Sequence, residues 1–421
     1  MSEPSPQQTR PDPAPTQPGA DRREMLRAVA GGNVMISVLA VVLSLVIGGV
    51  LIAFADQDVR EASSYFFARP TDMLSEAVES VRAAYSALLR GSLVNWRADN
   101  VASAIRPLTN SLVFATPLIL AGLGIAVAFR AGLFNIGAQG QIIVGAILAA
   151  YLGFAFDLPP GLHLLLAVLG GAMGGALWGA VPGVLKARFG ANEVIVTIML
   201  NYIAIFLISY ILKQPSFNPG RSGQRSPAVA ENATYPALIP DWVFGTAFRL
   251  HWGFVVALLA VAFVWWLMER STVGFELRAV GANPHAARTA GMSVGTVTVV
   301  TMVIAGALSG LAATAQVNGT EGSLTAGVAA SYGFDAITVA LLGRSRPVGT
   351  LVAGLLFGAL KAGGFLMQAE TQTPIDIILV VQSVIVLLIA APPLIRAIFR
   401  LPDPDRPRRP APDRTAEEAT A

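Results

Sequence analysis

RAGLFNIGAQGQ, residues 130–141, separates two long apolar runs and constrains how the chain can fold. Three glycines and the polar residues Asn135, Gln139 and Gln141 interrupt sequence that is otherwise apolar. An unpaired backbone group in hydrocarbon costs on the order of several kcal/mol, so such a break is stable only where it lines a cavity or packs against protein. The stretch is therefore either a helix break that lines a pathway or an ordinary turn between two helices.

The composition of the whole chain indicates a membrane protein. Of its 421 residues, 54% are hydrophobic and 13% are charged, whereas about 25% of a soluble domain is charged. The chain has no cysteine, which excludes disulfides and thiolate chemistry, and its three histidines lie in different segments and predict no metal site. The arginines cluster in loops and form no basic stripe, so no nucleic-acid partner is expected.

Ten apolar runs are long enough to cross a bilayer as helices, which takes about 20 residues each. Asp335 interrupts the eighth run and Lys361 the ninth. The predicted fold class is therefore an all-α polytopic membrane protein with about ten transmembrane helices, some of them broken or re-entrant. The runs are 34–55, 111–129, 136–156, 161–185, 194–212, 251–268, 292–317, 323–343, 347–367 and 374–395.

The domain organisation follows from these runs. The first run could be a signal sequence, because Ala53-Phe54-Ala55 resembles a cleavage site, but it is longer than a signal core of about 7–15 residues, and a retained helix is expected. The arginines that precede it predict a cytoplasmic N-terminus, and ten crossings return the C-terminus to the cytoplasm. The expected parts are disordered cytoplasmic tails at 1–30 and 400–421, a first transmembrane helix at 34–55, an extracytoplasmic amphipathic region at 56–110, a transmembrane core at 111–395, and, within it, an outer loop at 213–250 and a cytoplasmic loop at 275–291.

GANPHAARTAG, residues 281–291, predicts a short helix in that cytoplasmic loop. Asn283 suits the cap position, Pro284 the first helical position and Gly291 the left-handed position after the helix. A two-turn helix is not stable in water by itself, so a partner is expected to bind it. The residues expected to contact that partner are Gly281, Asn283, Pro284, Ala286, Ala287, Arg288 and Gly291.

Several polar residues lie inside or beside the apolar runs. Asn201 is in the middle of a run, where its amide needs either another helix or a polar solute, and Tyr202 beside it could add an aromatic face. Glu193 follows Asn192, and the pair could simply cap a helix. Asp335 is ionisable within an apolar run, which favours a functional role, although it could instead cap a half-helix.

Three motifs resemble the permease subunits of bacterial ABC importers for branched-chain amino acids, simple sugars and nucleosides. ELRAVGANPHAARTAGMSV, at 276–294, precedes a long apolar run that contains SGLAA. RAGLFNIGAQGQIIVGAILAAYLG, at 130–153, and NEVIVTIMLNYIA, at 192–204, are most similar to the nucleoside and simple-sugar subgroup. The resemblance covers roughly residues 105–395.

The resemblance implies a multi-pass subunit in the bacterial plasma membrane that is not an enzyme and binds no cofactor, with ATP bound by a partner. The partners it implies are a cytoplasmic ABC ATPase that binds helix 284–290, a second permease subunit that is usually a different chain, an extracytoplasmic solute-binding lipoprotein, and membrane lipid. A nucleoside is the expected solute, and a pentose is the alternative. The expected pathway residues are Asn135, Gln139, Glu193, Asn201, Tyr202 and Asp335.

Two other classes of protein remain in competition. An intramembrane enzyme would need clustered acids, a nucleophile beside a base, or metal ligands at membrane depth, and the sequence contains no such motif. An ion-coupled secondary carrier usually keeps several buried ionisable groups, whereas few acidic residues lie near the apolar runs here.

Overall fold

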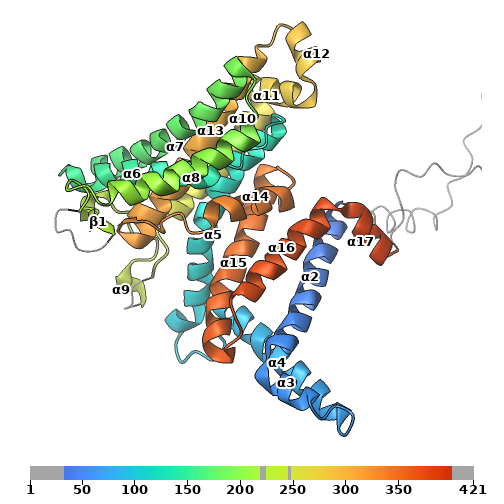
Figure 1. Ribbon diagram of the computed structural model, residues 1–421. Coiled ribbons are helices and arrows are strands. Elements are labelled where there is room, and N and C mark those ends of the chain that lie inside the picture. Colours follow the sequence, from blue (N-terminus) through green and yellow to red (C-terminus); the bar gives the residue numbers. More distant parts are fainter. Residues whose placement is uncertain (1–32, 219–223, 245–247, 401–421) are drawn as a thin grey trace, which may run out of the picture. The chain divides into compact units, whose positions relative to one another are not determined.

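The predicted helices form in the computed structural model, which describes residues 33–218, 224–244 and 248–400 (Figure 1). Within these residues, eight helices are long and apolar enough to cross a membrane. The protein is therefore an all-α polytopic membrane protein, as predicted. The eight are α2 (Asn33–Ala55), α5 (Val101–Arg130), α6 (Ala138–Ala155), α7 (Leu162–Phe189), α8 (Glu193–Ile211), α10 (Gly253–Arg270), α13 (Val294–Thr314), which continues as the π-helix η2 (Ala315–Glu321), and α15 (Pro347–Thr371).

Two of the predicted runs are not single spanning helices. Run 323–343 consists of strand β2 (Ser323–Thr325), a turn, and the 11-residue helix α14 (Tyr332–Leu342), which is too short to cross a bilayer. Gly322 ends η2 in the left-handed conformation, with φ of 66°. The helix formed by α13 and η2 therefore does not continue into run 323–343. Run 374–395 divides into α16 (Asp376–Ala390) and α17 (Pro392–Ile398), because the prolines at 392 and 393 lack the N–H groups that would continue α16.

The region before the core is helical. Within the amphipathic region expected at 56–110, helix α3 (Gln57–Ser63) is followed by helix α4 (Pro70–Ser92). Arg90 at its end forms an ion pair with Glu370 of α15, and the Nη1 to Oε1 distance is 2.9 Å. Helix α5 begins at Val101 rather than at 111, because Asn100 caps it by accepting a hydrogen bond from the Ser103 N–H. Residues 101–110 include polar side chains, so they were not counted in the apolar run 111–129.

The outer loop expected at 213–250 folds back on the helix ends. Its strand β1 (Arg225–Ala228) pairs antiparallel with β2, with Arg225 opposite Thr325. The loop then contains the 3-10 helix η1 (Glu231–Ala233) and the short helix α9 (Asp241–Phe244). The Asn318 side chain of η2 donates to the Ala233 carbonyl at 2.9 Å, which joins this loop to the π-helix.

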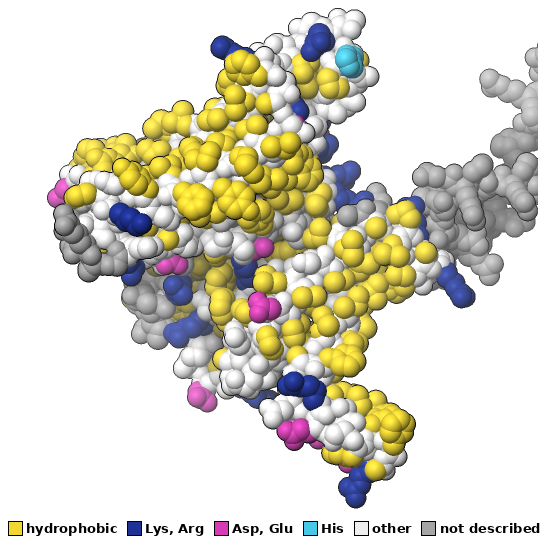
Figure 2. Space-filling model, viewed as in Figure 1, with side chains coloured by type: hydrophobic (Ala, Val, Ile, Leu, Met, Phe, Trp, Pro, Cys, Tyr) yellow, Lys and Arg dark blue, Asp and Glu magenta, His cyan; other side chains and the backbone are white. Residues whose placement is uncertain are grey.

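The described chain forms two compact units. One contains residues 44–386, and the described parts of the other are 33–43 and 387–400. Within the first unit, α5 is almost completely buried from Val113 to Ala128 among the other helices. Figure 2 shows hydrophobic side chains over α7 and α8. The exposed side chains of α7 recur every three or four residues, as expected for a lipid-facing stripe: Leu162, Leu165, Leu169, Met173 and Leu177.

Glycines bring α7 and α13 into backbone contact. A Cβ added to Gly175 would lie 2.1 Å from the Gly306 carbonyl oxygen, and one added to Gly310 would lie 2.1 Å from the Gly171 oxygen. Only glycine permits so close an approach, which is how membrane helices pack without a hydrophobic driving force. This contact fixes the spacing of the two helices at the centre of the larger unit.

Gly175→Ala should destabilise the protein, because its new methyl group would collide with the backbone of α13. The matched variant Gly295→Ala adds the same group at the start of α13, where the nearest atom would be 3.6 Å away. Alanine also favours the helix, so this control should be neutral or slightly stabilising. Melting temperatures in detergent measure both variants, and equal melting temperatures would contradict the backbone contact.

Candidate functional site

The break between α5 and α6 is partly buried, with Gly132 and Phe134 exposed and Asn135 and Gly137 buried. Helix α5 ends at Arg130 and α6 begins at Ala138, and the intervening backbone is irregular. Asn135 is fully buried within it; its Oδ1 accepts from the Gly137 N–H at 2.9 Å, and its Nδ2 donates to Gln141 Oε1 at 3.3 Å. The first bond gives a partner to a backbone N–H of the break, and the second holds the Asn135 amide in place.

Asn201 of α8 holds the same break from the other side. Its Oδ1 accepts from the Gly140 N–H at 2.8 Å, and its Nδ2 donates to the Ile136 carbonyl at 2.9 Å. Both polar ends of the amide are therefore bonded to backbone groups of the break. The neighbouring Tyr202 is 57% exposed on the surface of α8 and does not join this group.

Gln139, which follows the break, binds the start of α14. Its Nε2 donates to the Ala330 carbonyl at 2.8 Å, and its Oε1 accepts from the Gly333 N–H at 3.0 Å. Ala330 has a φ of 39°, which is unfavourable for a residue with a side chain. The amide thus stabilises a strained turn that would otherwise leave backbone groups unpaired.

Asp335 is neutralised by Lys361 of α15. The Nζ to Oδ2 distance is 2.7 Å, and the two side chains are 14% and 16% exposed. The Ser331 hydroxyl donates to Asp335 at 2.7 Å and accepts from Lys361 at 3.0 Å. The Lys361 ammonium also lies 4.4 Å from the centre of the Tyr332 ring. Gln139 and this ion pair together fix the start of α14, and with it the position of Tyr332.

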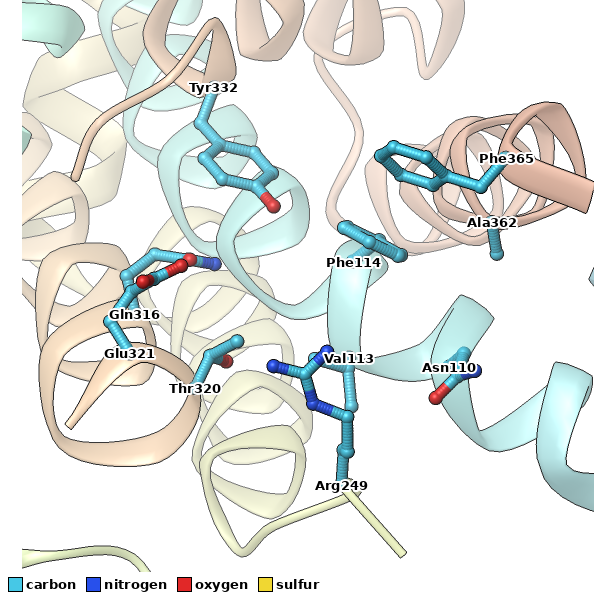
Figure 3. A pocket seen from close by; sticks show the side chains of 10 residues that line it. All are labelled: Asn110, Val113, Phe114, Arg249, Gln316, Thr320, Glu321, Tyr332, Ala362 and Phe365. Atoms are coloured by element: carbon cyan, nitrogen blue, oxygen red, sulfur yellow. The ribbon is translucent and has the colours of Figure 1, made fainter. Parts of the chain in front are cut away.

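Tyr332 forms one wall of a cavity of about 350 Å³ (Figure 3). Figure 3 shows polar groups on one side, with Gln316 and Glu321 facing the ring of Tyr332, and aromatic groups on the other, with Phe114 beside Phe365. Such a cavity can hold a solute that is apolar on one side and forms hydrogen bonds on the other. It is lined by Asn110, Val113 and Phe114 of α5, Arg249 before α10, Gln316, Thr320 and Glu321 of η2, Tyr332 of α14, and Ala362 and Phe365 of α15.

The structure brings together only part of the predicted set. Asn135 and Asn201 converge on the break. Gln139 and Asp335 both bind the start of α14, Gln139 through Ala330 and Gly333 and Asp335 through Ser331. Glu193 pairs with Lys186 at the start of α8, where Asn192 caps the helix. None of the six is among the ten residues that line the cavity.

None of the lining residues is among the pathway residues predicted from the sequence. Arg249 was assigned to an outer loop, and Thr320 and Glu321 lay just beyond the end of an apolar run. The run of polar residues from Gln316 to Glu321 at the end of α13 was the signal that could have indicated them. A lone arginine in a loop carries no such signal.

The predicted short helix is present as α12 (Pro284–Thr289), after α11 (Thr272–Ala282). Asn283 caps it by accepting from the N–H groups of His285 at 3.0 Å and Ala286 at 3.1 Å, as predicted. Gly291 is left-handed, with φ of 87°. Figure 1 shows α12 beyond the ends of α7 and α13. Its side chains are exposed except for Ala287, which is buried.

The segment before α12 touches the break directly. A Cβ added to Gly281 would lie 2.2 Å from the Arg130 carbonyl oxygen and 2.9 Å from the carbonyl carbon of Ala131. On the facing side, Gly132 is left-handed, with φ of 72°, and its own added Cβ would lie 3.2 Å from the Gly281 Cα. Two backbones therefore meet here without a side chain between them.

Comparisons with known proteins agree on one class of protein. The family model described as "Branched-chain amino acid transport system / permease component" matches residues 108–390. The guanosine ABC transporter permease of Bacillus subtilis is 40% identical over 322 residues, which are 76% of this chain and 88% of that protein. No solved structure matches the chain.

Two further relatives are described as permeases for two different solutes, glucose and nucleosides. A glucose ABC transporter permease of Haloferax volcanii is 35% identical over 286 residues, covering 67% of this chain and 75% of that protein. A nucleoside ABC transporter permease of Lactococcus lactis is 34% identical over 292 residues, covering 68% and 79%.

Asp335→Asn and Lys361→Met should each destabilise the protein, because each leaves one charge without its partner. The loss for a fully buried pair is about 3–5 kcal/mol, and the partial exposure of this pair lowers it. The double variant removes both charges and should recover most of the melting temperature in detergent. A double variant as unstable as the sum of the two single variants would contradict the pairing.

Proposed function

The chain belongs to the family of branched-chain amino acid transport system permease components, and we propose that, as a permease subunit of an ABC importer, it transports nucleosides. The observation that carries this proposal is the 40% identity to a guanosine permease over 88% of that protein's length. A nucleoside permease at 34% identity supports the same solute.

A simple sugar, such as a pentose, is the second candidate. It is favoured by the 35% identity to a glucose permease. A nucleoside contains a pentose, so one set of polar groups could bind either solute. The aromatic side of the cavity supports the nucleoside, because a base has a flat face that stacks on aromatic rings.

Membership of this family also defines which functions lie on other chains. A permease subunit of an ABC transporter is not an enzyme, and the family implies an ATPase and a solute-binding partner. In the proposed assembly, ATP binds to the ATPase in the cytoplasm. A second permease, a different chain, completes the pathway, and an outer lipoprotein delivers the solute.

Helix α12 is the proposed contact with the ATPase. It is short, and Asn283 caps its start. All of its side chains are exposed except that of Ala287. Because Ala287 is buried against the protein itself, the docking surface consists of its exposed neighbours, including Ala286 and Arg288. This assignment places α12 and both chain termini in the cytoplasm of a bacterial cell, with the helices in its plasma membrane.

The proposed transmission of motion follows from two contacts. A displacement of α12 reaches the break through Gly281, because the backbone there abuts Arg130. The break continues into α6, whose Gln139 holds the start of α14 and thus positions Tyr332. Of the six predicted pathway residues, we propose that Asn135, Gln139, Asn201 and Asp335 shape the pathway by holding its backbone. Glu193 and Tyr202 are proposed to act at its periphery.

The solute is tested by transport with the complete importer, reconstituted in vesicles with its ATPase and binding protein. Labelled guanosine, uridine, ribose and glucose are offered separately with and without ATP. We expect saturable, ATP-dependent uptake of at least one nucleoside, and at least tenfold slower uptake of the free sugars. Uptake of ribose or glucose without any nucleoside would contradict the proposal.

Ala286→Arg should abolish uptake while the protein still folds and enters the membrane. The added side chain would project from the exposed surface of α12 and prevent close approach of the ATPase groove. Ser64→Arg, at an exposed position after α3, is the matched control and should leave uptake unchanged. Copurification of the ATPase measures the contact, and its retention with normal uptake in the Ala286 variant would remove α12 from the coupling.

A further inference from the structure

We propose that the cavity bounded by η2, α14, α5 and α15 is a nucleoside-binding site within this subunit. The base lies against Phe365, and the hydrogen-bonding edges face Arg249 and Glu321. This inference rests on the proposed function and specifies which residues bind the solute.

The dimensions and lining of the cavity suit a small molecule. Its volume of about 350 Å³ lies at the lower end of the range for small-molecule sites, about 300–1,000 Å³. Its walls come from four helices and the segment before α10, so they converge from distant parts of the sequence (Figure 3). All of these elements belong to the larger compact unit.

The aromatic wall is already arranged for stacking. The rings of Phe114 and Phe365 are stacked, with centroids 5.6 Å apart and planes at 26°. Phe365 lines the cavity and remains 55% exposed, so its ring is not fully covered by other side chains of this chain. Every base has a π-face and can occupy such a position, whereas a free sugar cannot stack in the same way.

The polar wall contains one positively charged side chain, Arg249, and one negatively charged side chain, Glu321. Within the described residues, the side chains of Arg249 and Glu321 form no ion pair or hydrogen bond; Glu321 accepts from Arg225 only through its backbone carbonyl. The guanidinium can donate to a base carbonyl or ring nitrogen, and the carboxylate can accept from an N–H or a ribose hydroxyl. Together they favour a neutral polar solute over an anionic nucleotide.

The π-helix explains why these polar groups meet. The wider turn of η2 lies at the end of α13, and Gln316, Thr320 and Glu321 all reach the cavity from it. π-helical turns are rare and occur frequently at functional sites. The opposite wall, Tyr332, is fixed by its neighbours' bonds to Gln139 and Lys361. The site is therefore connected to the same backbone contacts that were proposed to transmit motion from α12.

The absence of cysteine from the sequence permits a direct test. Thr320→Cys places the chain's one thiol at the cavity, and Ser64→Cys places one outside it as the matched control. The complete importer is treated with a maleimide in the presence of guanosine, uridine, ribose or buffer. We expect a nucleoside to slow alkylation at position 320 at least fivefold, ribose to slow it much less, and neither to change alkylation at position 64.

Transport kinetics provide a second measurement on the same importer. Glu321→Gln should raise the KM for nucleoside uptake at least tenfold, with little change in the maximal rate, and Glu321→Asp should recover part of this loss. Phe365→Leu should also raise the KM. Glu231→Gln on η1 and the fully exposed Phe67→Leu are the matched controls and should leave the KM unchanged.

The outcomes separate this inference from the proposed function. If the wild-type importer carries nucleosides but no nucleoside protects position 320 and the Glu321 and Phe365 variants keep a normal KM, the cavity is not the binding site and the proposed function stands. If the wild-type importer carries a sugar and no nucleoside, both proposals are overturned.

Discussion

Hydrocarbon offers no hydrogen-bond partner to an unpaired peptide group, and the irregular parts of this protein depend on that constraint. The chain leaves helical geometry between α5 and α6 and again before α14. At both places, side-chain amides supply the missing partners: Asn135 and Asn201 bind the first break, and Gln139 binds the turn before α14. The amides therefore give hydrogen-bond partners to backbone that has left helical geometry.

The same amides connect regions that are distant in sequence. Gln139 belongs to α6 yet holds α14, and Asn201 belongs to α8 yet holds the start of α6. The ion pair of Asp335 with Lys361 adds α15 to this set. As a result, side-chain hydrogen bonds and one ion pair link the break to the turn before α14 and to α15, and a close backbone contact at Gly281 links the break to the segment before α12.

Much of the fold could be predicted from sequence, because length and apolarity alone define a spanning helix. The capped helix near Pro284 was also predictable, since its signals are local and independent of tertiary contacts. The half-length α14 was not, because the apolar run from 323 to 343 begins with a strand that pairs with the outer loop and contains Ala330 at a positive φ before the helix starts.

The candidate site was less accessible to prediction, for a physical reason. An amide in an apolar run must have a partner, but its sequence does not reveal whether that partner is a solute or a peptide group; Asn201 binds peptide groups. Arg249 and Glu321 meet at one cavity only after folding, since one precedes α10 and the other ends η2. Local patterns carry no information about such convergence.

The contact between Gly281 and Arg130 has a mechanical consequence. Where side chains separate two moving parts, their rotamers can turn and absorb the first part of a displacement. Here main chain abuts main chain, and backbone hydrogen bonds from Ala131 N–H to the Val127 carbonyl and from Leu133 N–H to the Ala128 carbonyl hold the turn. In the proposed assembly, a displacement of α12 would therefore pass through this contact to the break without first being taken up by side-chain rotation.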